Sequence, residues 1–250
     1  MGPALDIGTL YLATAVVAGF YGIALLGFHT IDSTTHGILH WGLAYLLVAV
    51  GLTLNLFRGT LPLLLYGPIA SLGFIAAAVL LDAGMREPAN AREPLLDLGL
   101  PIAALVLLLV FAYLVPSIAV RLEVLFLALA VLTTRTSVRL VRSARAAEDG
   151  LRPALVVFSA FYTVLALVLV ALSLLALVVG PVHDIAGAHP IHALLLPGLM
   201  LFLIGAGMSK LWVHYLRAYD EAKRAATTDP LTGVRNRRYV MPELERMFGR

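Results

Sequence analysis

The sequence has 250 residues, of which 60% are hydrophobic and only 13% are charged. Its mean hydropathy of +0.93 is too high for a soluble domain of this size, so we expect a membrane protein. The formal net charge of +3 is small, and we infer no nucleic-acid partner from it. Because the chain has no cysteine, it can form neither disulfides nor thiolate metal sites.

Long apolar segments follow one another along almost the whole chain. A bilayer core about 30 Å thick needs roughly 20 mostly apolar residues per helix. The seven predicted spans are residues 9–28, 37–57, 61–81, 94–114, 117–134, 154–179 and 191–213. The fourth and fifth could instead be one helix, but Pro116 favours a reversal between them. The predicted fold is therefore an all-α polytopic bundle of seven transmembrane helices.

The distribution of basic residues predicts the orientation, because Lys and Arg in short loops stay on the cytoplasmic side. We expect a loop at residues 135–152, and it would be cytoplasmic because it carries Arg135, Arg139, Arg142, Arg145 and Arg152. The loop at residues 180–190 has no Lys or Arg and is expected outside. Seven spans then place the N-terminus outside and the C-terminus inside. The first eight residues also lack the basic region of a cleavable signal peptide.

The composition divides the chain into a membrane domain at residues 1–213 and a polar tail. No predicted loop is long enough for a folded binding domain, so a stimulus would be read within the bundle, at its rims or from the lipid. Two pairs of small residues at helical spacing, Ala15 with Gly19 and Gly67 with Ser71, are expected to allow close helix packing.

The last span is predicted to continue as a cytoplasmic stalk over residues 214–228. Its seam has the four-three spacing of a coiled coil and consists of Leu211, Tyr215, Ala218, Ala222 and Ala225. This pattern predicts that the stalk pairs with a second copy of the chain, as a homodimer. The alternative is a single solvated helix end, because the seam is shorter than three heptads.

A turn and a second helix are expected after the stalk. Pro230 disfavours helix at Asp229, and Gly233 permits a reversal. Apolar residues at helical spacing then predict a helix that begins near Arg237 and includes Met247.

The same segment resembles the opening of GGDEF diguanylate cyclase domains, which consists of Asp-x-Leu-Thr followed by Gly-x-x-Asn-Arg-Arg. The matching residues, called the opening motif below, are Asp229, Leu231, Thr232, Gly233, Asn236, Arg237 and Arg238. The resemblance implies that residues 229–250 begin a GGDEF domain in the bacterial inner membrane, and that the full protein makes cyclic di-GMP from two GTP molecules with Mg²⁺.

The family's catalytic and metal-binding residues lie downstream of this motif and do not occur before Arg250. We therefore expect the chain alone to be a regulatory module without catalytic residues or cofactors, with Mg²⁺ and GTP bound only by the missing catalytic domain. An Arg-x-x-Asp pattern like that of the family's inhibition site occurs at Arg217 to Asp220, but in the wrong place.

Ionisable residues inside the spans are candidates for sensing, because they are costly in a membrane. Arg121 and Glu123 are the clearest, although both could reach the headgroups and only stabilise the helix. The other candidates are polar residues near the span ends, namely His36, His40, His183, Asp184, His189 and His192. His36 and His40 are weak metal or haem candidates by spacing, whereas the outer group could respond to pH.

The expected partners are membrane lipids and a small hydrophobic or periplasmic ligand. An alternative function is a transporter, a membrane-embedded enzyme or a ligand-binding protein in which the opening motif is coincidental. A retinal protein would need a lysine in the last span, and Lys210 lies there. We expect Lys210 to be an interfacial anchor instead, because no carboxylate is placed as its counter-ion.

Overall fold

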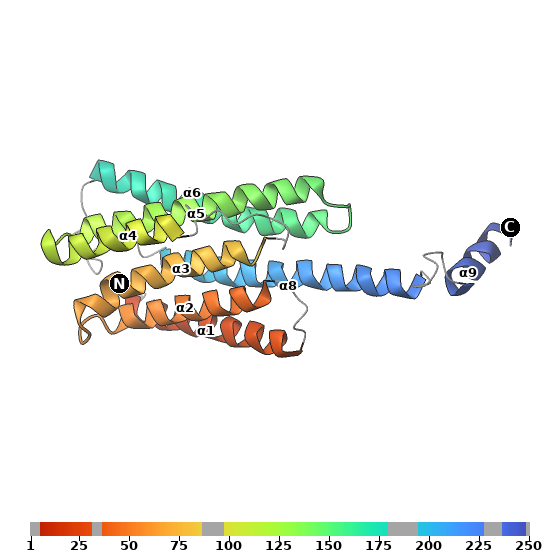
Figure 1. Cartoon of the computed structure of the whole chain (residues 1–250), viewed down its shortest axis with the longest axis horizontal. Coiled ribbons are helices and arrows are strands. Elements are labelled where there is room, and N and C mark those ends of the chain that lie inside the picture. Colours follow the sequence, from red (N-terminus) through yellow and green to blue (C-terminus); the bar gives the residue numbers. More distant parts are fainter. Residues whose placement is uncertain (1–5, 32–36, 87–97, 180–194, 228–236, 249–250) are drawn as a thin grey trace, which may run out of the picture.

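The computed structural model describes residues 6–31, 37–86, 98–179, 195–227 and 237–248. All regular structure in these ranges is helical, which confirms the predicted all-α class. Figure 1 shows a bundle of helices packed side by side, from which α8 (Leu195–Thr227) extends toward α9 (Arg237–Phe248).

An antiparallel pair, α1 (Ile7–Ile31) and α2 (Ile38–Leu56), begins the bundle. Asp6 caps α1 by accepting a hydrogen bond from the Thr9 backbone N–H at 3.0 Å. The two helices touch at Gly22 and Gly42, because a Cβ on either residue would lie within 3.2 Å of the other's carbonyl oxygen. The tightest contact thus falls one turn after the predicted Ala15 and Gly19 pair.

The next two helices each contain a π-helical turn. Residues Leu65–Ile69 form the π turn η1, which holds Pro68 and runs into α3 (Ala70–Ala83). Such turns often mark functional sites in helices. The helix α4 (Leu100–Leu109) continues as the π turn η3 (Val110–Leu114). The chain then reverses at residues 115–117, and the Ser117 hydroxyl accepts a hydrogen bond from the Val120 N–H at 3.3 Å. The predicted break between the fourth and fifth segments is confirmed.

The helix α5 (Ile118–Ala146) extends well past the predicted end at residue 134. The prediction of a loop at residues 135–152 is therefore wrong for residues 135–146. The physical reason is that Arg135 and Arg139, one helical turn apart, both bind a buried carboxylate on α3 and so belong to the packed bundle. Only a short connection separates α5 from α6 (Arg152–Val179).

The helix α8 is continuous over 33 residues, which confirms that the last apolar segment continues into the polar stalk. The predicted second helix is also confirmed, because α9 begins at Arg237 and ends at Phe248.

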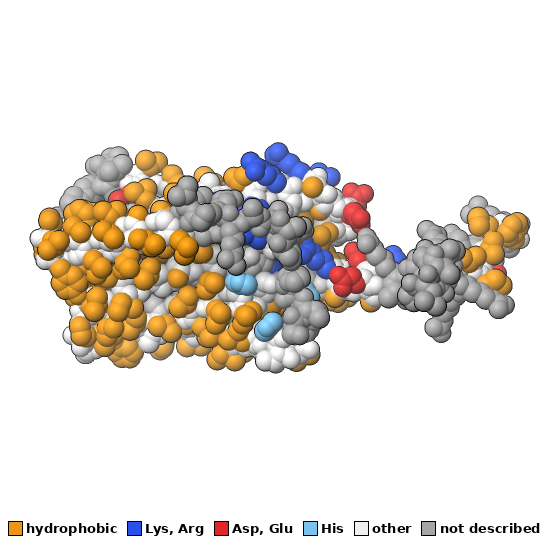
Figure 2. Space-filling view, viewed as in Figure 1, with side chains coloured by type: hydrophobic (Ala, Val, Ile, Leu, Met, Phe, Trp, Pro, Cys, Tyr) orange, Lys and Arg blue, Asp and Glu red, His pale blue; other side chains and the backbone are white. Residues whose placement is uncertain are grey.

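Within the described ranges, five helical segments could cross a membrane by length and composition, namely Ile7–Ile31, Ile38–Leu56, Leu65–Ala83, Arg152–Leu174 and Leu195–Lys223. Their outer faces are apolar, and Phe20, for example, is 70% exposed. Figure 2 shows hydrophobic side chains over most of the visible face of the bundle, with Lys and Arg toward the end from which α8 extends. Such a surface is suited to lipid rather than to water. The structure thus describes a helix bundle compatible with a membrane.

Candidate functional site

The last turn of α3 holds a fully buried carboxylate, Asp82. Its Oδ2 pairs with Nη2 of Arg86 at 2.8 Å and with Nη2 of Arg135. From one turn further along α5, Nη1 of Arg139 donates to both carboxylate oxygens at 2.9 Å. The Thr136 hydroxyl donates to Oδ1 at 3.0 Å. Asp82 therefore joins α3 to α5 through the guanidinium groups of Arg135 and Arg139 and the hydroxyl of Thr136, while its third guanidinium partner, Arg86, lies four residues further along its own segment.

The C-terminus of α3 is also bound by α2 and α8. The Lys210 ammonium on α8 donates to the Gly84 carbonyl at 3.0 Å and lies 5.7 Å from the centre of the Trp41 ring. Trp41 Nε1 on α2 donates to the Leu81 carbonyl at 3.1 Å. A cation at this position is favoured because the last carbonyls of a helix carry partial negative charge. Lys210 is only 7% exposed, so the expectation of an interfacial anchor is wrong.

Position 37, directly before α2, requires a glycine. Gly37 has a φ of 85°, which residues with a Cβ rarely adopt, and an added Cβ would collide with the Gly84 carbonyl. We call this assembly the α3 junction and define it as Gly37, Trp41, Asp82, Gly84, Arg86, Arg135, Thr136, Arg139 and Lys210. It joins α2, α3, α5 and α8 at the end of the bundle from which α8 extends.

Sequence reasoning missed the role of Asp82, which directly follows the predicted span at residues 61–81. It used the arginines of α5 only to orient the chain. One feature could have indicated the pairing: an acidic residue directly follows an apolar segment, and Arg135 and Arg139 have the spacing that places both on one face of a helix. The partner helix could not have been read from that spacing.

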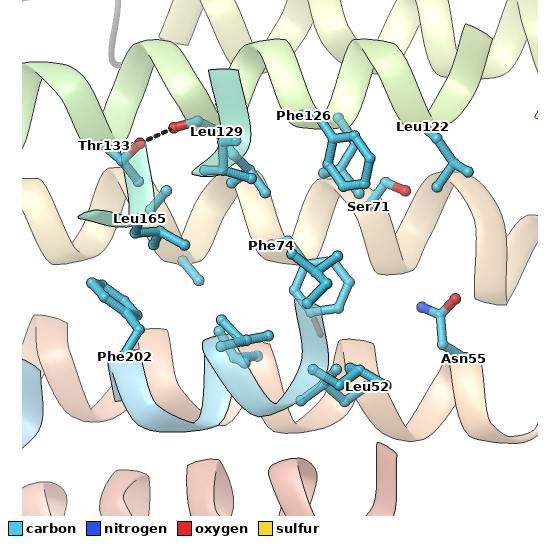
Figure 3. A pocket seen from close by; sticks show the side chains of 18 of the residues that line it. Leu52, Asn55, Ser71, Phe74, Leu122, Phe126, Leu129, Thr133, Leu165 and Phe202 are labelled. Atoms are coloured by element: carbon cyan, nitrogen blue, oxygen red, sulfur yellow. Dashed lines mark hydrogen bonds between the residues drawn. The ribbon is translucent and has the colours of Figure 1, made fainter. Parts of the chain in front are cut away.

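A cavity of about 370 Å³ lies in the interior of the bundle. Apolar side chains from α2, α3, α5, α6 and α8 line most of it, and Figure 3 shows Leu52, Phe74, Phe126 and Leu165 among them. Gly67 and Ser71, which were expected to allow close helix packing, line this cavity instead. Its volume and its mostly apolar lining are typical of ligand pockets.

Two arginines line the same cavity, Arg58 just after α2 and Arg121 in the first turn of α5. Arg121 Nε donates to the Ser117 carbonyl at 3.3 Å, and its Nη1 lies 3.0 Å from the point where Gly67 would carry a Cβ. In the described ranges, neither arginine forms an ion pair with a carboxylate. The cavity therefore presents two positive charges to a bound molecule.

Tyr162 on α6 also belongs to the cavity lining. Tyr162 is 1% exposed, and its hydroxyl has no hydrogen-bond partner among the residues that the structure describes. Glu123 was predicted together with Arg121, and its Oε2 is likewise buried without a partner in the described part of the chain. Unlike Arg121, Glu123 does not line the cavity.

Of the predicted histidine candidates, His40 is the one within the described residues. His40 is exposed in the first turn of α2. Within the described residues there is no group of three His, Asp or Glu side chains that could hold a metal ion. The remaining candidates lie outside the described residues, namely His36, His183, Asp184, His189 and His192.

The stalk seam is described as far as Ala222. Leu211 packs against the core of the bundle, whereas Tyr215 is 63% exposed and stacks on Tyr219 with ring centres 6.3 Å apart. Ala218 and Ala222 are exposed on the same helix, and Ala225 lies in its last turn. The seam is thus accessible from Tyr215 to Ala222, and its pairing with a second copy stays a prediction.

Most of the opening motif lies outside the described residues, namely Asp229, Leu231, Thr232, Gly233 and Asn236. Arg237 and Arg238 are the first residues of α9. No protein-family model matches the sequence, and no curated protein or solved structure is significantly similar to it. Any functional assignment therefore depends on the residues of this chain.

Proposed function

We propose that the chain is the membrane sensory module of a diguanylate cyclase. In this proposal seven helices cross the bacterial inner membrane, with the N-terminus outside and the C-terminus in the cytoplasm. The two added spans are α4 with η3, which is apolar but short, and α5, whose charges cluster near its ends. The arginines of α5 lie toward the end from which α8 extends, and this placement supports a cytoplasmic location for that end.

The observation that carries the proposal is the continuity of α8. The helix lines the cavity near its start, binds the α3 junction through Lys210 and continues to Thr227, two residues before Asp229 of the opening motif. A change in the bundle would thus reach the opening motif through one uninterrupted helix. The proposed output is a change in how two stalks pair, which would control whether two catalytic domains meet.

The decisive experiment begins with the gene sequence beyond Arg250. We expect a GGDEF-type turn downstream, and we expect membranes that contain the complete gene product to make cyclic di-GMP from GTP and Mg²⁺. A complete gene without that turn, or an intact turn whose protein makes no cyclic di-GMP in any membrane preparation, would contradict the proposal. A ligand-binding role centred on the cavity would then be the better supported function.

Cysteine crosslinking tests the stalk, and the absence of native cysteines makes the background clean. Ala218→Cys and Ala222→Cys should each join two chains efficiently in native membranes. Arg217→Cys is the matched control on the same exposed helix and should crosslink poorly. Equal crosslinking at all three positions would eliminate the proposed seam.

A further inference from the structure

We propose that the interior cavity binds a single-chain acidic amphiphile, a molecule of the fatty-acid class, whose carboxylate lies between Arg58 and Arg121 and whose chain extends between α3, α5 and α6. This inference does not depend on the link to cyclic di-GMP. It is carried by the shape of the cavity, by its two arginines and by one buried hydroxyl.

The shape of the cavity fits one hydrocarbon chain. On α5 its lining includes Leu122, Phe126, Leu129 and Thr133, which lie on one face of the helix. At 1.5 Å per residue, the distance from Leu122 to Thr133 is roughly 16 Å, so the cavity is elongated along the helices. Figure 3 shows this row of side chains opposite Phe74 and Leu52. A volume of about 370 Å³ is near the lower end of ligand pockets, about 300–1,000 Å³, which favours one chain over a two-chain lipid.

The charge of the lining selects an acidic headgroup. Arg58 and Arg121 both contribute to the wall, and within the described chain no carboxylate neutralises either of them. A carboxylate can accept paired hydrogen bonds from a guanidinium, which offsets the cost of holding arginine among apolar residues. Gly67 has no Cβ and so allows the Arg121 guanidinium to approach the backbone closely, since a Cβ there would lie 3.0 Å from Nη1. Asn55 also lines the cavity, and its Nδ2 donates one hydrogen bond to the Gly51 carbonyl at 2.9 Å, which leaves its second N–H as a neutral donor.

A second polar position lies among the lining residues of α6. The Tyr162 ring packs edge-on against Phe202, with ring centres 5.1 Å apart, and its buried hydroxyl has no partner in the described ranges. By contrast, the Thr133 hydroxyl already donates to the Leu129 carbonyl, and the Thr136 hydroxyl is already used at the α3 junction, where it donates to Asp82. Since a buried hydroxyl is costly without a hydrogen bond, an oxygen on the chain of the ligand would be favoured beside Tyr162.

Photolabelling of the full chain in lipid nanodiscs tests the proposal, with a diazirine-bearing myristate as the probe. We expect labelled peptides from α5 between Leu122 and Thr133. Unlabelled myristate should displace the probe, and myristyl alcohol should need at least a ten-fold higher concentration. Equal displacement by the acid and the alcohol, or labelling confined to the outer faces of the helices, would overturn the proposal.

Variants distinguish binding in the cavity from general effects of charge on myristate binding. The double variant Arg58→Gln with Arg121→Gln should weaken myristate displacement at least ten-fold. Arg142→Gln is the matched control, because Arg142 is on α5 but is exposed and does not line the cavity. Ala78→Phe fills the cavity without a change of charge and should abolish labelling of α5. If the control weakens binding as much as the double variant, or if native mass spectrometry finds a two-chain phospholipid held by the same arginines, the proposal fails.

The buried hydroxyl has its own test. Wild-type protein should bind ω-hydroxymyristate several-fold more tightly than myristate, and Tyr162→Phe should remove this preference. Tyr113→Phe is the control, since Tyr113 is 52% exposed and lies outside the cavity. A preference that survives in Tyr162→Phe would overturn the role of this hydroxyl.

Discussion

The α3 junction and the cavity are two interior regions of the same bundle with opposite polar chemistry. At the junction, Asp82, Lys210 and the Trp41 indole each hydrogen bond to a named partner. Around the cavity, Arg58 and Arg121 have no carboxylate partner in the described ranges, although Arg121 Nε donates to the Ser117 carbonyl, and the Tyr162 hydroxyl has no hydrogen-bond partner there. Paired buried groups fix the geometry of helices, whereas unpaired ones have hydrogen-bonding capacity left for a ligand. The comparison therefore separates a structural region from a binding region.

Removing the charge of Asp82 should have the largest effect. Asp82→Asn leaves three guanidinium groups without their shared carboxylate and should lower the free energy of unfolding by about 3–5 kcal/mol. Unfolding of the detergent-solubilised protein, followed by circular dichroism, measures this loss. Asp149→Asn is the control, because Asp149 is exposed between α5 and α6. If the two variants were equally stable, the junction would not hold the bundle together.

Lys210→Met should have the second largest effect. The variant keeps an apolar side chain but removes the donor to the Gly84 carbonyl and the cation beside Trp41. Because hydrogen bonds to charged groups contribute more than neutral ones, we expect a loss of about 1.5–3 kcal/mol. Arg217→Met changes an exposed cation on the same helix and should cost far less. Matching unfolding curves for the two variants would contradict the role of Lys210 in the α3 junction.

A pair of identical substitutions compares a satisfied hydroxyl with an unsatisfied one. The Tyr45 hydroxyl donates to the Leu203 carbonyl, so Tyr45→Phe should cost about 1 kcal/mol. The Tyr162 hydroxyl has no such partner among the described residues, so Tyr162→Phe should leave the ligand-free protein equally stable or more stable. Both rings are about 1% exposed, which makes the pair well matched. A larger loss for Tyr162→Phe would show that its hydroxyl is bonded within the protein.

Asp6 should give the smallest effect. Hydrogen bonds from the Thr9 side chain and then from the Thr9 and Gly8 backbones lower the pKa of this exposed carboxyl below its ordinary value of 3.8. A lowered pKa means that the capping contribution is present above pH 3.8 and is lost as the pH falls through the folded-state value. The Asp6→Ala variant should therefore unfold at a slightly lower temperature than wild type at pH 6. The difference should disappear near pH 2, and an unchanged difference there would contradict the capping role.

The sequence predicts the helices better than their contacts. Apolar length located most segments, Pro116 marked the break before α5, and the seam from Leu211 indicated that the last helix continues. The end of α5 was missed because its arginines were taken for loop residues, although they bind a carboxylate more than fifty positions earlier. That pairing joins residues far apart in the sequence, and the cavity wall likewise combines side chains from several helices. The spacing of residues along one helix shows which of them share a face, but it does not show which other helix packs against that face.

Lys210 holds α8 near the middle of the helix, so a tilt around this contact would move the two ends of α8 in opposite directions. At 1.5 Å per residue, α8 is about 50 Å long, and Lys210 lies close to its middle. A tilt of about 5° around this fixed contact would move Leu195 and Thr227 in opposite directions by roughly 2 Å each. The arm that begins at Leu195 forms part of the cavity wall, and the other arm lies beyond the junction. A displacement at the cavity would therefore reach the far end of α8 reversed in direction and undiminished in size.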